Sequence, residues 1–181
     1  MTAEEAQKFL SACEEVCPEY HAFFFTALRA GLRKGELIAL QWGDLQFGES
    51  ETDRNRFLLV QRNCYMGQFG TPKNHECRRI DMSKQLRIVL SHLKDAAHLR
   101  AFMAGRNSIA GDLVFPSEIG TPISPDNIVP RCMEPALEQA GLRRFRFHDL
   151  RHTFGSLLIQ GGVSPAYVQK QMGHKSIQVH R

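Results

Sequence analysis

Helix start and stop signals recur along this chain of 181 residues and frame one strand-like stretch in its first half. Thr2 with Glu5 three positions later forms a capping box ahead of an apolar helical pattern that we expect to reach about Cys13. Gly31 is a stop for a second, buried helix that follows Pro18. Further helices are expected over residues 34–40, 83–102, 124–141, 148–160 and 164–172, with a last helical start at Ser176.

Three β-like segments lie between the helices expected over residues 34–40 and 83–102. They are Asp44 to Phe47, Phe57 to Arg62 and Arg78 to Met82, with turns supplied by Gly48 and by the stretch from Gly67 to Pro72. A brief extended piece is expected at residues 113–115. No repeat or linker divides the chain, so we predict one domain over residues 1–181, mainly α with a small three-stranded antiparallel sheet.

Composition narrows the class of protein. Hydrophobic residues make up 43% of the chain, enough for a core, but no apolar run approaches the roughly 18 residues of a membrane span. The first residues are acidic, unlike a secretion signal. Five cysteines form no disulfide framework and favour a reducing interior. We therefore expect a cytoplasmic protein, associated with the nucleoid in a prokaryotic host. The cysteines are Cys13, Cys17, Cys64, Cys77 and Cys132.

The net charge of +4 hides an asymmetry. Residues 141–181 hold seven lysines and arginines against one acid, Asp149. Such a field suits a polyanion, and nucleic acid is the commonest one inside a cell, although a solvated basic face explains the charge equally well. The DNA-binding candidates in this segment are Arg143, Arg144, Arg146 and Lys175.

Two further places could handle a phosphate. Arg33 follows the turn at Gly31 at the start of a helix, where its guanidinium can point outward beside positive backbone N–H groups. Lys73 lies on a turn that leads into a strand with paired arginines, and a lysine at a hairpin tip is a mobile donor. A surface arginine paired with Glu36, and a solvated hairpin lysine, are the structural alternatives.

The sharpest pattern is His148-Asp149-Leu150-Arg151-His152, followed later by His174. His148 and Arg151 share one face of a helix and can converge on one anion. His148 and His152 also have zinc-ligand spacing, but Arg151 would place a fixed positive charge beside the dication, so metal is disfavoured.

The order Arg33, Lys73, His148-x-x-Arg151 and His174 resembles the catalytic domain of the tyrosine recombinases, the phage integrase family. The resemblance spans nearly the whole chain and implies the DNA breaking-rejoining fold of that family. It implies an enzyme that cuts and rejoins strands of double-stranded DNA at specific sites through a 3′-phosphotyrosyl intermediate, and no cofactor, because arginines, lysine and histidines supply the positive field.

The resemblance also implies a role for each residue. Arg33 and Arg151 would grip the non-bridging oxygens of the scissile phosphate, and Glu36 would support the first arginine. Lys73 would be the general acid for the leaving 5′ oxygen, and His148 a proton acceptor or shuttle. His174 would hydrogen-bond the phosphate. We expect Arg151 to face solvent, so that its replacement by alanine would abolish cleavage and leave the fold intact.

The sequence departs from the family pattern at both ends. The spacing of the family places its nucleophilic tyrosine just beyond Arg181, and none of Tyr20, Tyr65 and Tyr167 has the right offset. The N-terminal DNA-clamping domain is also missing. We therefore expect a catalytic domain truncated before its nucleophile, monomeric and unable to cleave DNA covalently, from a protein that works as a tetramer on paired sites. The alternative is a DNA-binding or regulatory module that keeps the phosphate pocket without the chemistry.

Overall fold

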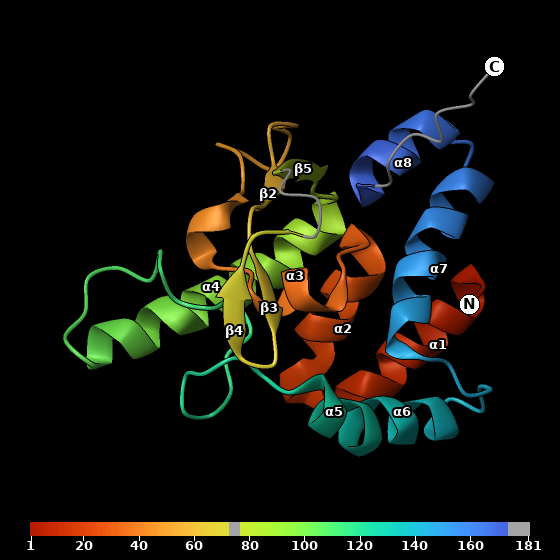
Figure 1. Cartoon of the computed structure of the whole chain (residues 1–181), viewed down its shortest axis with the longest axis horizontal. Helices are drawn as coiled ribbons and strands as arrows, with labels where there is room; N and C mark the ends of the chain where they lie inside the picture. Colours follow the sequence, from red (N-terminus) through yellow and green to blue (C-terminus); the bar gives the residue numbers. More distant parts are fainter. Residues whose placement is uncertain (73–76, 174–181) are drawn as a thin grey trace.

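The computed structural model describes residues 1–72 and 77–173, and Figure 1 shows the arrangement of its elements. The sequence prediction of a mainly α chain with a three-stranded antiparallel sheet is confirmed. The α-helices are α1 (Ala3–Val16), α2 (Pro18–Ala30), α3 (Lys34–Ile38), α4 (Lys84–Met103), α5 (Pro125–Ile128), α6 (Glu134–Gln139), α7 (Phe147–Gln160) and α8 (Pro165–Met172). The strands are β1 (Leu45–Gln46), β2 (Phe57–Val60), β3 (Asn63–Tyr65), β4 (Gln68–Gly70) and β5 (Arg78–Asp81).

The helix starts are made by the side chains that the sequence indicates. The Glu5 backbone N–H donates to Thr2 Oγ1 at 3.1 Å while the Thr2 N–H donates to the Glu5 carboxylate at 2.7 Å, which completes the capping box of α1. Ser83 and Ser164 accept from the first turns of α4 and α8 in the same way. Helix α1 ends at Val16, about one turn beyond Cys13, because the chain stays helical until the Pro18 restart.

The prediction of one uninterrupted α-helix over residues 124–141 is wrong. A π-helical segment, Val129–Met133, separates α5 from α6. Pro130 and Pro135 lie inside the expected helix, and a proline there removes an N–H donor and clashes with the carbonyl one turn earlier. The backbone passes these prolines by widening to the π geometry rather than by ending.

The sheet has the strand order β1-β2-β5 and is antiparallel throughout. Leu58 lies opposite Ile80, and both are fully buried on the face toward the core. A second, two-stranded sheet of β3 and β4 was not predicted. Its turn has positive φ at Met66 and Gly67, and methionine is rare in that conformation, so the sequence carries no hairpin signal there. The extended piece expected at residues 113–115 is reduced to an isolated bridge between Gln41 and Leu113.

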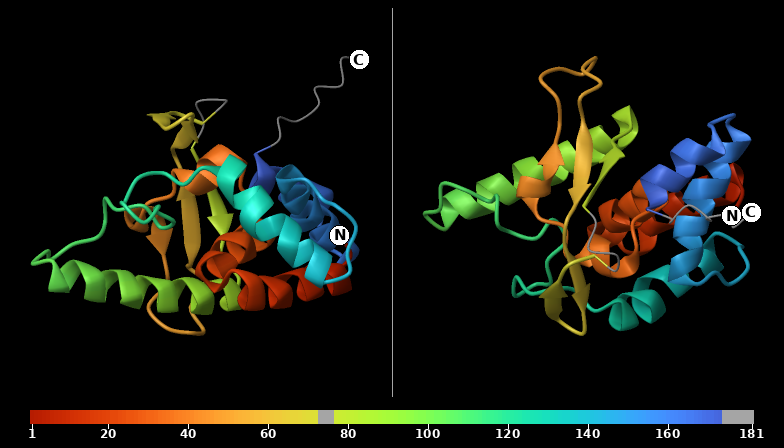
Figure 2. Two further views of the ribbon diagram at one scale, coloured as in Figure 1. Left: turned by 90° about the horizontal axis from the view of Figure 1, so that it is seen from below. Right: turned by 45° about the horizontal axis from the view of Figure 1, so that its top comes forward.

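Two groups of elements are visible in Figures 1 and 2. Helices α1, α2 and α7 pack together on one side, α4 lies along the sheet on the other, and α8 contacts both α7 and β5. One continuous core joins the groups, with aromatic contacts of Phe23 to Phe24, Phe115 and Phe147 at its centre. Within the described residues, no helix is both long and apolar enough to cross a membrane.

The turn after α2 sets the direction of the chain toward Arg33 and tolerates no side chain. Gly31 has φ of 59°, a left-handed conformation, and a Cβ built there would lie 2.2 Å from the ring of Phe154 on α7. Gly31 therefore lets the end of α2 touch α7, and it fixes where the chain leaves toward α3.

We predict that Gly31→Ala destabilises the fold by about 2–4 kcal/mol, the sum of a left-handed alanine and an overpacked contact. Gly141→Ala is the matched control, because Gly141 has φ of 65° but nothing near its Cβ position. Urea unfolding of both variants checks the prediction. Equal losses of stability would show that the contact with Phe154 does not matter.

Candidate active site

Arg33 lies at the N-cap of α3, directly after the Gly31 turn. Its backbone N–H donates to Glu36 Oε2 at 2.8 Å, and its Nη1 donates to Glu36 Oε1 at 2.9 Å. Its Nη2 donates to the carbonyl of Gly173 at 3.0 Å, across 140 positions of sequence. With 26% of its side chain exposed, Arg33 is anchored by the protein and still reachable from solvent.

Glu36 is a buried carboxylate shared by two arginines. Only 1% of its side chain is exposed, and besides Arg33 it accepts two bonds from Arg78, at 2.7 Å from Nη1 and 2.6 Å from Nη2. Burial alone would raise the pKa of Glu36, but the hydrogen bonds and charges of Arg78 and Arg33 outweigh it and lower the pKa from 4.5 to about 2. Glu36 is therefore ionised at neutral pH. The predicted pairing of Arg33 with Glu36 is present, but in a buried network rather than on the surface.

The structure corrects the sequence prediction for the exposure of Arg151. We expected it to face solvent, and it is only 3% exposed. Its two terminal nitrogens donate to the carbonyls of Gly31 and Met172. Burial, together with the positive charges of Arg33 and Arg78, lowers the pKa of Arg151 to about 10, so it keeps its charge at neutral pH. Because Arg151 joins the ends of α2 and α8 to α7, its replacement by alanine will cost stability, contrary to the sequence prediction.

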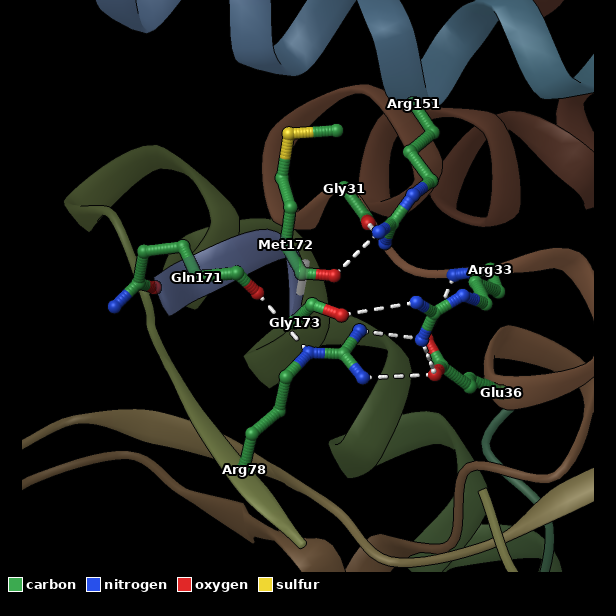
Figure 3. A network of polar contacts seen from close by, with 8 residues as sticks. All are labelled: Gly31, Arg33, Glu36, Arg78, Arg151, Gln171, Met172 and Gly173. Atoms are coloured by element: carbon green, nitrogen blue, oxygen red, sulfur yellow. Dashed lines mark hydrogen bonds and ion pairs between the residues drawn. The ribbon is translucent and has the colours of Figure 1, made fainter. Parts of the chain in front are cut away.

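The three guanidinium groups meet at one place, the C-terminal end of α8 (Figure 3). Arg78, Arg151 and Arg33 donate in turn to the carbonyls of Gln171, Met172 and Gly173. The last carbonyls of a helix have no partner within it and carry its negative dipole end, so they stabilise cations placed against them.

The charge balance of this cluster favours an anion. In the described part of the chain, the hydrogen-bonded group contains three arginines and one carboxylate, Glu36. Arginine presents a planar fork of N–H donors that matches the oxygens of a phosphate. A phosphate brought against Arg33, the most exposed of the three, would meet a surplus of positive charge in a partly desolvated site.

His148 lies one helical turn before Arg151 on α7 and is exposed. Its ring meets the ring of His152 edge to face, with centroids 4.7 Å apart. Partial burial, His152 and Arg151 together lower the pKa of His148, so its imidazole is neutral at pH 7 and can accept a proton.

The remaining predicted basic residues either lie outside the described part of the chain or have partners elsewhere. Lys73, His174 and Lys175 lie outside the described residues. Arg143, Arg144 and Arg146 are exposed near the start of α7, and each has a partner within the chain. These partners are the Phe145 ring, Glu134 and Asp149.

Arg78 was noticed in the sequence only as one of two paired arginines, without a role. A signal for it exists: on strand β5, Arg78 and Ile80 are two apart and so share a face, and Ile80 is fully buried. An arginine on the buried face of a strand needs a buried carboxylate, and Glu36 is that partner. Gln171, also buried, carried no such signal.

We predict that protonation of Glu36 destabilises the folded protein in acid. Because its pKa is lower in the folded protein, its stabilisation is complete above pH 4.5 and disappears as the pH falls toward 2. The wild type should lose on the order of 3 kcal/mol more than Glu36→Gln between pH 5 and 2. Denaturant unfolding across this range measures the difference, and parallel pH curves would contradict the prediction.

Among curated proteins, the ICEBs1 integrase of Bacillus subtilis is 30% identical over 179 residues, which cover 96% of this chain and 46% of that protein. A XerC-like tyrosine recombinase of Caldanaerobacter subterraneus is 28% identical, covering 87% of this chain and 43% of the other. The chain thus spans less than half the length of these two relatives.

Solved structures share the fold. The Tn1549 transposon integrase, in complex with transposon right end DNA, superposes with a TM-score of 0.76 at 22% identity, covering 97% of this chain and 58% of that one. The XerH recombinase bound to a palindromic difH substrate has a TM-score of 0.70 at 22% identity, covering 97% and 46%. Residues 1–181 match the family described as the phage integrase family. The chain therefore belongs to the phage integrase family of tyrosine recombinases.

Proposed function

We propose that this chain is the catalytic domain of a site-specific recombinase that cuts and rejoins DNA through a 3′-phosphotyrosyl intermediate. The observation that carries the proposal is the meeting of Arg33 and Arg151 at the end of α8, although they come from opposite ends of the chain. The related proteins are named as integrases and recombinases, and two of the solved structures contain DNA.

In this mechanism the two arginines bind the non-bridging oxygens of the scissile phosphate. Charge builds on those oxygens in the pentavalent transition state, and fixed guanidinium groups stabilise it without reorganisation. Arginine has five N–H donors, and the bonds of Arg151 to Gly31 and Met172 engage only two nitrogens, which leaves donors for a phosphate. Glu36 holds Arg33 at the right place by accepting from both its backbone and its side chain.

Proton transfer is assigned to His148 and Lys73. His148, neutral at pH 7 because of its lowered pKa, is suited to accept the proton of an attacking hydroxyl. By resemblance to the family, Lys73 protonates the leaving 5′ oxygen and His174 hydrogen-bonds the phosphate. His174 follows directly in sequence on Gly173, whose carbonyl accepts from Arg33.

Double-stranded DNA is the proposed partner, and the whole protein is proposed to act as a tetramer on paired sites. Arg143, Arg144, Arg146 and Lys175 are the proposed contacts to the DNA backbone. Arg144 and Arg146 would exchange their ion pairs for phosphates, which is feasible because exposed ion pairs contribute little to stability, and Arg143 would leave the ring of Phe145.

We predict salt-dependent binding of the 181-residue chain to duplex DNA, with a log–log slope of about −0.9 per phosphate contacted. Arg144→Ala should reduce the magnitude of this slope by about 0.9, the value for one phosphate contact. Arg106→Ala is the matched control, since Arg106 is also exposed and paired with an acid, Asp112, but lies outside the basic segment. Fluorescence anisotropy at several salt concentrations measures both. Binding that does not respond to salt would overturn the proposed contacts.

We also predict that the 181-residue chain forms no covalent adduct with DNA. Tyr65 is exposed on the β3–β4 hairpin, and the hydroxyl of Tyr167 donates to Asp81 at 2.8 Å. Burial and Asp81 raise the pKa of Tyr167 to about 12, which makes it a poor nucleophile. Incubation with a labelled nicked duplex and a denaturing gel tests this. A shifted band would refute the prediction, and its loss in Tyr167→Phe would identify the attacking group.

A further inference from the structure

We propose that Arg78 is a positioning residue of this site: it neutralises Glu36 and ties β5 to the end of α8, and thereby leaves the charge of Arg33 free for the DNA phosphate. The inference rests on the proposed function, because it assigns Arg78 a part in phosphate binding without contact to the phosphate.

The first support is the geometry of the ion pair. Arg78 and Glu36 meet fork to fork, with parallel bonds of 2.7 and 2.6 Å between side chains that are 11% and 1% exposed. The Nε of Arg78 donates to the carbonyl of Gln171 at 3.0 Å. All three nitrogens of the guanidinium are therefore engaged by the protein, so Arg78 is oriented inward rather than toward a ligand.

The second support is the sharing of Glu36. Each of its oxygens accepts one bond from Arg33 and one from Arg78. A buried carboxylate needs a full counter-charge, and among the described residues Arg33 is the other arginine that is hydrogen-bonded to Glu36. With Arg78 absent, the charge of Arg33 would be balanced by Glu36, and the surplus positive charge of the cluster would fall by one.

The third support is the attachment of α8. The side chain of Gln171 accepts from the Asp81 backbone N–H at 2.8 Å, and Tyr167 donates to the Asp81 carboxylate at 2.8 Å. With the bond from Arg78, these contacts fasten α8 to β5 along two of its turns (Figure 3 shows the part that involves Arg78). Gly173 is part of this fit, since a Cβ there would lie 2.9 Å from Arg78 Cδ. The carbonyls that accept from Arg33 and Arg151 thus depend on Arg78 for their position.

The adjacent residue provides a matched control. Arg79 points to the opposite face of β5 and is exposed, with its Cζ 4.0 Å from the centre of the Phe57 ring and its Nε 3.4 Å from the Asp81 carboxylate in a solvent-exposed ion pair. Arg78→Gln and Arg79→Gln remove the same charge from neighbouring positions. We expect Arg78→Gln to weaken binding to duplex DNA about tenfold or more, and Arg79→Gln to weaken it less than threefold. Equal effects would overturn the proposal.

A double-mutant cycle separates positioning from direct contact. If Arg78 acts through Glu36, Arg78→Gln will weaken DNA binding less in a Glu36→Gln background than in the wild type, and the remaining effect will be that of its bond to Gln171. If Arg78 itself binds the phosphate, the two changes will multiply instead, which overturns the assignment. Arg78→Lys keeps the charge but not the fork, and we expect it to recover only part of the affinity. It also serves as the test variant if Arg78→Gln does not fold.

Hydrogen exchange of the α8 amides is a readout that needs no DNA. Exchange there should be faster in Arg78→Gln than in the wild type and unchanged in Arg79→Gln. Unchanged α8 exchange in the Arg78 variant would overturn the inference even if the wild type binds DNA. A wild type that fails to bind DNA but shows the exchange effect would instead refute the proposed function and leave the link from Arg78 to α8 standing.

Discussion

The buried carboxylate of Glu36 is the interaction on which the arrangement of the site depends. Three guanidinium groups placed close together repel one another, and burial together with the positive charges of Arg33 and Arg78 lowers the pKa of Arg151. Glu36 offsets this repulsion by accepting from Arg33 and Arg78 at once, from helix α3 and strand β5. A single acid thus holds together elements that the chain order separates.

The carbonyls at the end of helix α8 also compensate the positive charge of the three arginines. These carbonyls bring negative partial charge, but no full anion, to the three arginines. Partial charges can hold guanidinium groups in place without cancelling them, so the cluster stays attractive to a polyanion. The contacts of α8 with β5 and α7 therefore have a chemical consequence as well as a packing one.

Much of the fold was readable from the sequence, because local chemistry decides where helices begin and end. Thr2, Ser83 and Ser164 cap helices as their side chains predict. The three strands of the main sheet were found because the middle segment is rich in leucine and valine and turn residues separate the three segments. The errors have local causes too: Pro130 and Pro135 force a π segment, and the hairpin turn at Met66 uses a residue that gives no turn signal.

The sequence by itself determined the helical class, the place of the sheet, the family resemblance and the pairing of Arg33 with Glu36, three residues apart on one turn. Only the tertiary structure decided that Arg151 is buried, that Arg78 shares Glu36 with Arg33, and that all three arginines meet at the end of α8. The reason is physical. Caps and turn residues act between near neighbours, whereas burial and the partner of a buried charge depend on contacts across 21 to 140 positions of sequence.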